Sequence, residues 1–347
     1  MNEISNPPAT ISSIALDSFD PEAMTETVQC STLDHTLLQS GRFRGRLLQA
    51  QRGNCRLDWG RYNLPVLAWG PLAEDRLTLG LLLHSAEPCT FNGQSVPQGA
   101  MLVYSENHEL HTRLAAEPGW VSLQLERDFL ASAGLELPGR YFDVLVPELQ
   151  TLLRLGKMLV PLLGSLDAIG RHDAPSNLGA AQAMGSIEDA MILALCESLA
   201  ARRSSLSPPT SGATSDAIRT VRRAESYIDS RLDEPITIGE LCAELGCPMH
   251  TLERLFSKTH GVSPRRFLTY RRLTALRGLL MRHTPDQISV TDAAMRCGLS
   301  HFGRTAGSYK SVFGEAPSDT LKRRPSAPPN GRKNLQNDRS QPLTRWS

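Results

Sequence analysis

The sequence lacks any run of about eighteen uninterrupted apolar residues, so no segment has the pattern of a membrane-spanning helix. Its start, residues 1–13, is polar and contains no basic stretch followed by an apolar run, so no secretory signal is recognisable. The seven cysteines are odd in number and scattered, and no CxxC pair occurs, which argues against a disulfide framework and a zinc ribbon. We therefore expect a reduced, cytoplasmic protein without a membrane partner.

Common catalytic signatures are absent as well. The sequence has no phosphate-cradling GxxxxGK[ST] loop and no nucleophile elbow around a serine. Three histidines, His84, His108 and His111, fall in a strand-rich region, but they lack the adjacent HxH pair and the following carboxylate typical of small metal-binding barrels. We therefore expect no enzymatic activity, no cofactor and no metal ligands.

The net charge of +1 conceals an asymmetry along the chain. Residues 1–216 contain 15 Lys and Arg against 24 Asp and Glu, whereas residues 217–324 contain 18 against 11. A basic block on an acidic chain is typical of a nucleic-acid-binding domain. A solvated basic surface is the common alternative, so the charge alone does not decide between them.

Residues 27–203 are predicted to form one domain. Residues 27–130 contain short, partly alternating runs separated by Gly, Pro and Asn, which is typical of antiparallel strands. Asn92-Gly93 suits a hairpin turn, because both residues tolerate positive φ. Residues 141–203 carry leucines at helical spacing. This pattern predicts a small antiparallel sheet or barrel followed by helices.

The remainder of the chain differs in composition. Residues 204–216 are rich in Ser, Pro, Thr and Gly and are predicted to be a flexible linker. Residues 217–324 are predicted to be helical nearly throughout, and residues 1–26 and 325–347 to be disordered. The expected fold class is α+β in two domains, the first a β-barrel with helices and the second all-α.

The helical block contains an internal repeat. Residues 236–264 and 288–317 align with an offset of 52 positions, which pairs Gly246 with Gly298, and the offset becomes 53 after that turn. Two such units with one inserted residue at a turn are expected to adopt the same structure. Any structure assigned to the first unit must therefore also fit the second.

Each unit is predicted to be a helix-turn-helix, over residues 238–260 and 290–313. Gly246 and Gly298 follow the first short helix of each unit, where glycine accepts the left-handed conformation that ends a helix. A second helix begins about three residues later, and in a DNA-binding helix-turn-helix this reading helix lies in the major groove.

The two reading helices carry polar residues on one face. In the first unit His250, Glu253 and Arg254 lie at i, i+3 and i+4. Arginine contacts guanine edges and glutamate accepts from the cytosine amino group. Alternatively, Arg254 contacts phosphate or solvent and Glu253 pairs with a neighbour. The matching stripe of the second unit consists of His301, Arg304 and Ser308.

A single helix over residues 264–283 is predicted to connect the two units. About 19 residues of helix span roughly 28 Å, and successive major grooves on one face of DNA are about 34 Å apart. The connecting helix is therefore expected to hold the reading helices one DNA turn apart. Its arginines are predicted to spread over its surface: Arg265, Arg266, Arg271, Arg272 and Arg277.

Residues 221–324 resemble the DNA-binding domain of AraC/XylS-type transcriptional regulators. The most specific similarity is an inner alanine, a CGF-like group, an aromatic-Lys pair, FG and P-S, here Ala294, Cys297-Gly298-Leu299, Tyr309-Lys310, Phe313-Gly314 and Pro317-Ser318. The resemblance implies a seven-helix domain. With the polar stripes it suggests these DNA-contacting residues: His250, Thr251, Glu253, Arg254, His301, Phe302, Gly303, Arg304, Ser308 and Lys310.

The second reading helix departs from the family pattern. Thr305 stands where relatives usually have a large apolar residue. Gly303 and Gly307 each cost the helix about 1 kcal/mol relative to Ala. We hypothesise that this helix is less stable until DNA orders it.

The N-terminal half is similar to the effector-binding or dimerisation regions of this family, which tend to be cupin-like barrels, and more loosely to regulators of the ethanolamine-operon type. An effector pocket would be lined by Trp59, Tyr62, Trp69, His84, Phe91, Tyr104 and Trp120, although these residues suit plain core packing as well. Dimerisation is expected through Leu149, Leu152 and the helix around Met191.

The sequence therefore predicts a DNA-binding transcription regulator, more specifically an activator, in the cytoplasm and associated with the nucleoid. Its expected partners are promoter DNA, RNA polymerase, a small-molecule effector and a second copy of the chain. The alternative interpretation is a cupin-like metal-dependent enzyme domain fused to a DNA-binding module.

Overall fold

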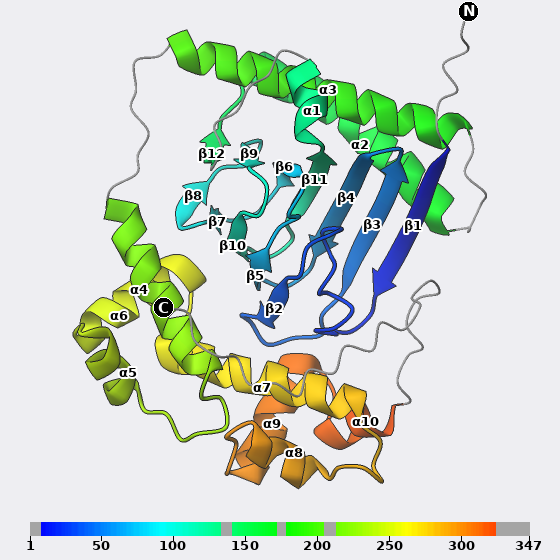
Figure 1. Cartoon of the computed structure of the whole chain (residues 1–347). Helices are drawn as coiled ribbons and strands as arrows, with labels where there is room; N and C mark the ends of the chain where they lie inside the picture. The colour runs from blue at the N-terminus through cyan, green and yellow to red at the C-terminus, as the bar shows by residue number, and fades with distance from the viewer. Residues whose placement is uncertain (1–7, 133–140, 172–177, 205–212, 324–347) are drawn as a thin grey trace, which may run out of the picture.

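The computed structural model describes residues 8–132, 141–171, 178–204 and 213–323. Strands dominate the chain up to Leu145, and helices dominate it afterwards (Figure 1). This arrangement confirms the expected α+β class, with a β-rich N-terminal part and an all-α C-terminal part. None of the helices in these ranges is long and apolar enough to span a membrane.

The strands form two antiparallel sheets, one with the order β1-β3-β4-β11-β6-β9-β12 and one with the order β2-β5-β10-β7-β8. No strand pair within the described ranges joins one sheet to the other, so closure of the expected barrel is not seen. The two sheets face each other, because residues of both line one cavity. The strands are β1 Ala9–Leu16, β2 Asp34–Leu37, β3 Gly45–Arg52, β4 Cys55–Tyr62, β5 Val66–Pro71, β6 Leu77–His84, β7 Cys89–Phe91, β8 Gln94–Val96, β9 Met101–Tyr104, β10 Glu109–Leu114, β11 Gly119–Leu125 and β12 Phe142–Leu145.

The larger sheet is covered on both faces. Successive side chains of a strand point to opposite faces, so Thr78 and Gly80 of β6 face the smaller sheet, while Leu79 and Leu81 pack on helices. Those helices are α2 Leu149–Arg171 and α3 Leu178–Ser204, and the short α1 Arg127–Ser132 follows β11. Double coverage explains why β6 reads as a nearly continuous apolar run.

Two N-terminal boundaries differ from the sequence prediction. The expectation of disorder for residues 1–26 is wrong from residue 8 onward, because β1 pairs with β3 over its whole length. It half-buries Ile11 against the helical layer and Ile14 on the opposite face. Residues 1–7 lie outside the described ranges. The prediction of helix from residue 141 is also wrong at first, because Phe142–Leu145 pairs with β9 as an edge strand.

The C-terminal part consists of seven helices in the described ranges, the number that the family resemblance implies. They are α4 Ala213–Asp229, α5 Ile238–Leu245, α6 Met249–His260, α7 Pro264–Arg282, α8 Val290–Arg296, α9 Phe302–Phe313 and α10 Pro317–Lys322. The predicted linker over 204–216 is too long at its C-terminal end, since residues 213–216 are the first turn of α4. Residues 205–212 and 324–347, and with them most of the linker and the tail, lie outside the described ranges.

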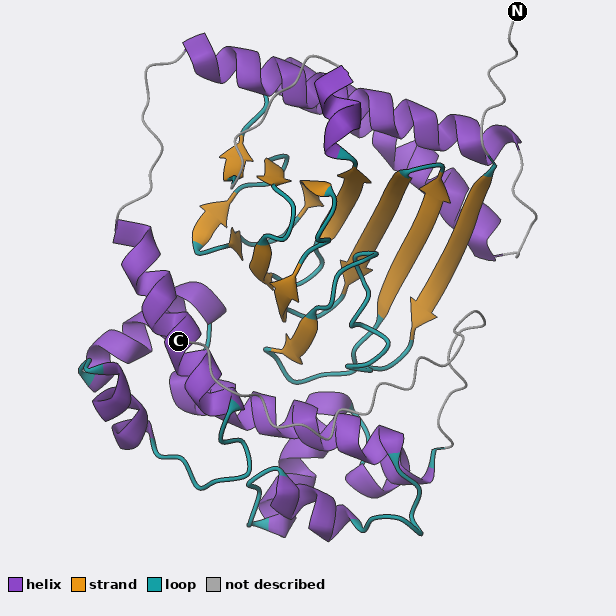
Figure 2. Ribbon diagram, in the orientation of Figure 1, coloured by secondary structure: helices purple, strands orange, loops and turns teal. Residues whose placement is uncertain are grey.

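The two parts pack directly against each other. The C-terminal helices line the lower and left sides of the strand layers (Figure 2). Leu67 of β5 and Leu38, which follows β2, share a core with residues of α4, α5 and α6. Phe19 stacks on Phe313 of α9 with ring centroids 6.1 Å apart. The helix-turn-helix units therefore share apolar cores with the N-terminal part.

Asp58 on β4 is a fully buried carboxyl. The backbone N–H of Gln29 donates to its Oδ2 at 3.1 Å, and the Gln29 side-chain amide donates to its Oδ1 at 3.0 Å. Burial raises the pKa of Asp58 from 3.8 to about 7, although the hydrogen bonds from Gln29 lower it. The native state therefore keeps a proton that the unfolded chain loses, and stability falls as the pH rises through this window.

We predict that the free energy of unfolding of the wild-type protein falls, relative to that of Asp58→Asn, by up to about 4 kcal/mol between pH 4 and pH 7. Asparagine does not ionise, so the variant lacks this dependence. Burial lowers the pKa of His35 to about 4, so His35 makes the protein more stable as the pH rises. Both proteins contain His35, so its contribution cancels in the difference between them. Denaturant unfolding at several pH values measures the difference, and a pH-independent difference would contradict the prediction.

Candidate nucleic-acid interface and buried cavity

The first helix-turn-helix unit is shaped by local interactions. Thr237 caps α5 by accepting from the backbone N–H of Glu240, and the Glu240 carboxylate accepts from the backbone N–H of Thr237 at 2.8 Å. This capping box fixes where α5 begins. Gly246 ends α5 with φ of 62°, a left-handed conformation that costs glycine little.

The second unit uses the same devices. Ser289 caps α8 by accepting from the N–H of Asp292 at 3.0 Å. Gly298 has φ of 66°, and a Cβ there would lie 2.4 Å from the carbonyl oxygen of Leu232. Gly298 is therefore required both for its conformation and for the close approach of the chain that follows α4. The glycines after both reading helices, Gly261 and Gly314, are left-handed as well.

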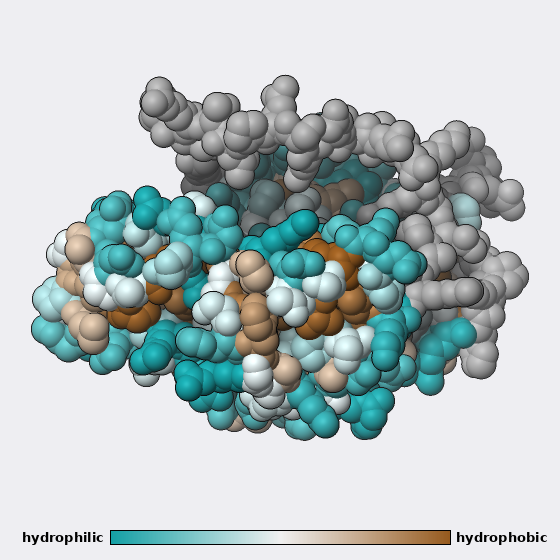
Figure 3. All heavy atoms as spheres, turned by 90° about the horizontal axis from the view of Figure 1, so that it is seen from below, coloured by the Kyte–Doolittle hydropathy of each residue, from teal (hydrophilic) through white to brown (hydrophobic). Residues whose placement is uncertain are grey.

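The reading helices α6 and α9 present most of the predicted DNA-contacting residues to solvent. Leu252 and Phe256 on α6, and Tyr309 on α9, are buried and anchor the opposite faces. Thr251 and Ser308 are half-buried, and the remaining candidates are exposed: His250, Glu253, Arg254, His301, Phe302, Gly303, Arg304 and Lys310. Figure 3 views the molecule from the side of these helices, where hydrophilic and neutral atoms surround separate apolar patches.

A groove of about 720 Å³ lies between the two units. Glu253 reaches it from α6, and the candidates that reach it from α9 and its N-cap are His301, Arg304 and Ser308. The structure thus brings these four candidates together from both units. The other six do not line the groove: His250, Thr251, Arg254, Phe302, Gly303 and Lys310. Arg265 of α7 also lines it and is exposed. The sequence alone did not single out Arg265 among the α7 arginines as a residue near the reading helices.

The expectation that all α7 arginines are on the surface is wrong for two of them. Arg271 and Arg277 are 9% and 0% exposed. The Arg271 Nη2 lies 2.7 Å from Asp229 Oδ1, and its guanidinium covers the Trp69 ring at 4.2 Å. Arg277 Nη1 lies 2.9 Å from Glu315 Oε1. These residues bind acidic and aromatic partners brought by other segments, which the spacing along α7 does not reveal.

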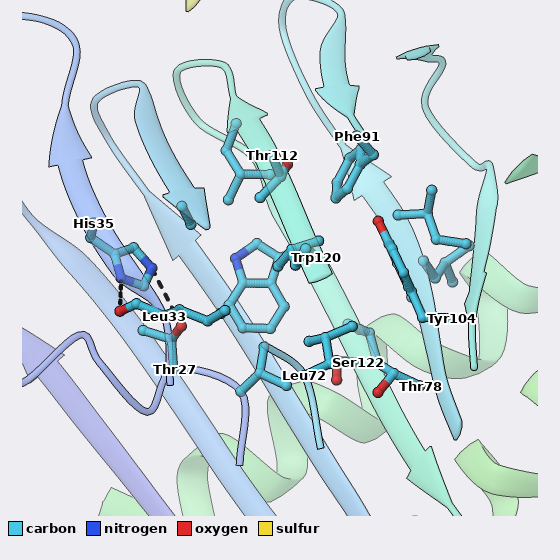
Figure 4. Close-up of a pocket in the computed structure, with 18 of the residues that line it drawn as sticks. Thr27, Leu33, His35, Leu72, Thr78, Phe91, Tyr104, Thr112, Trp120 and Ser122 are labelled. Atoms are coloured by element: carbon cyan, nitrogen blue, oxygen red, sulfur yellow. Dashed lines mark hydrogen bonds between the residues drawn. The ribbon is translucent and has the colours of Figure 1, made fainter. Parts of the chain in front are cut away.

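A buried cavity lies between the two sheets. Its volume is about 60 Å³, which exceeds the roughly 15 Å³ that one water molecule needs. Four of the seven predicted ligand-lining residues contribute to its wall. The four residues are Tyr62, Phe91, Tyr104 and Trp120. Figure 4 shows Phe91 and Tyr104 on one side, His35 on the other, and Trp120 between them.

The cavity wall offers neutral polar groups. The hydroxyls of Thr78, Tyr104 and Thr112 are buried and have no hydrogen-bond partner among the described residues. Burial raises the pKa of Tyr104 and lowers that of His35 to about 4, so both are uncharged near neutral pH. Within the described ranges, no Asp, Glu, Lys or Arg lines this cavity.

The other three predicted ligand-lining residues lie elsewhere. Trp59 and His84 line a separate hollow beside α2, and His84 is exposed. Trp69 lies under Arg271 at the boundary between the two parts. The prediction grouped aromatic residues by the strand region in which they occur, but alternation along each strand sends neighbours to opposite faces.

The three histidines that were weighed as metal ligands do not converge. His84 is at the exposed end of β6, and His108 stacks beside Tyr104 and Phe142 with centroids 5.5 and 5.8 Å away. His111, on β10, points instead to Glu225 of α4. The fold therefore does not bring these three histidines together into a metal site.

Known proteins are similar to this chain in its C-terminal helical part. A family model described as a helix-turn-helix domain matches residues 241–323. The chain is 34% identical over 110 residues to the XylDLEGF operon transcriptional activator 3 of Pseudomonas putida, which is 32% of this chain and 33% of that protein. The chain carries an AraC/XylS-family DNA-binding domain.

Two further proteins are similar to this AraC/XylS domain and cover a comparable share of the chain. The probable thc operon regulatory protein of Rhodococcus erythropolis is 34% identical over 102 residues, 29% of this chain and 31% of that protein. The crystal structure of a probable AraC family transcriptional regulator from Rhodopseudomonas palustris is 38% identical over 30% of this chain and 94% of that chain, with a TM-score of 0.28. The chain thus spans about a third of the length of the curated relatives it matches.

The second reading helix of the AraC/XylS domain allows a test of its glycines. A Cβ at Gly307 would meet no atom within 4 Å. We predict that Gly307→Ala raises the free energy of unfolding by about 0.5–1 kcal/mol, because alanine loses less backbone entropy in a helix. Gly298→Ala, the matched control, should lower it by more than about 1 kcal/mol because of its positive φ and contact with Leu232. Melting temperatures measure both, and a decrease for Gly307→Ala would refute the argument.

Proposed function

We propose that this protein is a sequence-specific transcription regulator, more specifically an activator, whose residues 217–324 bind promoter DNA. The observation that carries the proposal is the pair of helix-turn-helix units with matching caps, left-handed glycines and exposed polar faces on α6 and α9. Helix α7, about 28 Å long by its 19 residues, separates the two units. That length suits two reading helices in successive major grooves.

Each reading helix has an exposed arginine that is proposed to contact a base. We predict that Arg254→Ala and Arg304→Ala each weaken specific binding by about 1–3 kcal/mol and relax the preference at one base pair. Arg219→Ala, which removes the same charge from α4 outside both reading helices, is the control and should preserve the sequence preference.

The binding site is first obtained by selecting DNA fragments that the purified protein retains at near-physiological salt. A motif with two half-elements about one helical turn apart is expected, and the variants are then compared on this site and on random DNA. Equal losses on both DNAs would assign the arginine to a phosphate contact. Retention of DNA without any motif would refute sequence-specific recognition.

The N-terminal domain, residues 27–203 together with β1, is proposed to bind a small-molecule effector in the cavity between its sheets. The apolar wall, the unpaired hydroxyls and the lack of charged lining residues within the described ranges favour a neutral, mostly apolar molecule with one or two hydrogen-bonding groups. The cavity of about 60 Å³ suits a small ligand, and a larger one would have to displace lining side chains.

The Thr112 hydroxyl allows a test of this cavity. We predict that Thr112→Val raises the free energy of unfolding of the ligand-free protein by about 1 kcal/mol, because valine has nearly the same shape and removes a buried unpaired hydroxyl. The same variant should bind cavity ligands more weakly. Thermal shift in a library of small neutral compounds measures both effects. Thr90→Val, whose hydroxyl donates to the Thr259 carbonyl at 3.3 Å, is the control and should not be stabilised.

A second copy of the chain is the proposed partner of α2. Its outer face exposes Leu149, Leu153 and Val160, which follow one face of the helix and are 69%, 49% and 62% exposed. In the helix around Met191, Met191 itself is fully buried in the core of α3 and the larger sheet, whereas Leu193 is 48% exposed. RNA polymerase is the proposed partner of the activator at the promoter, and the proposed location is the cytoplasm, on the nucleoid.

A further inference from the structure

Three buried side chains of metal-ligating type meet where the N-terminal and C-terminal parts touch. His111 comes from β10, Glu225 from α4, and His260 is the last residue of the reading helix α6. Glu225 Oε1 lies 2.8 Å from His111 Nε2 and 2.6 Å from His260 Nε2. The three residues are only 3%, 5% and 0% exposed, and their ligand atoms lie within 4.8 Å of one another.

The hydrogen bonds around His260 restrict its protonation. The Thr259 hydroxyl donates its one proton to the Leu255 carbonyl at 2.8 Å, so it accepts from His260 Nδ1, which lies 2.6 Å away. His260 Nδ1 therefore carries a proton. In the neutral imidazole the Nε2 atom then has a lone pair, and this lone pair faces the carboxylate of Glu225.

Two lone pairs at 2.6 Å repel each other unless a cation lies between or beside them. Either a proton between His260 Nε2 and the Glu225 carboxylate or a metal ion supplies this positive charge. A metal ion would accept both lone pairs without protonating the ring.

We propose that His111, Glu225 and His260 bind one divalent transition-metal ion, with Zn²⁺ favoured, between the N-terminal domain and the first helix-turn-helix unit. Two imidazole nitrogens and one carboxylate oxygen form a ligand set that Zn²⁺ uses in proteins. Binding would separate the nitrogens and the oxygen beyond their present hydrogen-bond distances, because each would then lie about 2.0–2.2 Å from the metal.

The surroundings provide access and orientation. A hollow of about 200 Å³, lined by His111 and Glu225 together with Trp69 and Arg222, adjoins the cluster and has room for a water molecule as the fourth ligand. Thr259 fixes the His260 ring from its other nitrogen, which is the usual role of the groups behind a metal-binding histidine. Because the ligands come from β10, α4 and α6, the ion would connect a strand that lines the cavity with a helix that reads DNA.

The experiment uses the full-length protein, stripped of metal with a chelator and titrated with Co²⁺ under reducing conditions. We expect one equivalent to bind with visible absorption bands of tetrahedral Co²⁺, and Zn²⁺ to displace it. Glu225→Gln keeps the size of the side chain and should weaken Co²⁺ binding at least tenfold. His84→Ala removes an exposed histidine and serves as the control, with unchanged affinity.

The outcomes separate this site from the cysteines. Intense near-ultraviolet charge-transfer bands would indicate thiolate ligands and overturn the proposal, as would the absence of uptake by the wild-type protein. Equal affinity of wild type and Glu225→Gln would overturn it as well. If circular dichroism shows that Glu225→Gln does not fold, His111→Gln replaces it, because His111 lies at the hollow, and the same tenfold loss is expected.

Discussion

The packing of the molecule depends on the buried guanidinium of Arg277. Its Nε donates to the carbonyl oxygen of Phe19, and its Nη1 binds Glu315 at 2.9 Å and the Tyr309 hydroxyl at 3.2 Å. A fully buried charge is costly unless it is paired and hydrogen-bonded. These partners come from the N-terminal segment, from α9 and from the loop before α10, so one side chain of α7 holds the second helix-turn-helix unit against the rest of the chain.

Helix α7 also supports other parts of the chain, because a second buried arginine lies six residues earlier. Arg271 binds Asp229 of α4 and donates to the Thr36 hydroxyl at 3.0 Å. Helix α4 and the smaller sheet are thereby held near the middle of α7, and the second unit is held further along it. Movement in the sheets would reach the reading helices through these contacts, which gives the proposed effector a physical route to DNA binding.

Local features of the DNA-binding domain were predictable from sequence. The helix ends at Gly246 and Gly298 depend on residues within a few positions of one another, so the repeat reveals them. The caps at Thr237 and Ser289 are equally local, although they were not identified from the sequence. The N-terminal domain was less predictable. Which of Trp59, Tyr62 and Trp69 lines the cavity depends on which strand face is turned inward, and pairing between distant strands decides that.

The sequence by itself determined the two helix-turn-helix units and their polar faces, because helix periodicity, caps and glycine turns are short-range physics. Only the tertiary structure decided which arginines are buried, which aromatic residues surround the cavity, and that His111 meets Glu225 and His260. The 114 positions between His111 and Glu225 carry no local signal of that contact. The packing of a sheet on a helix brings such groups together, and no spacing along the chain encodes it.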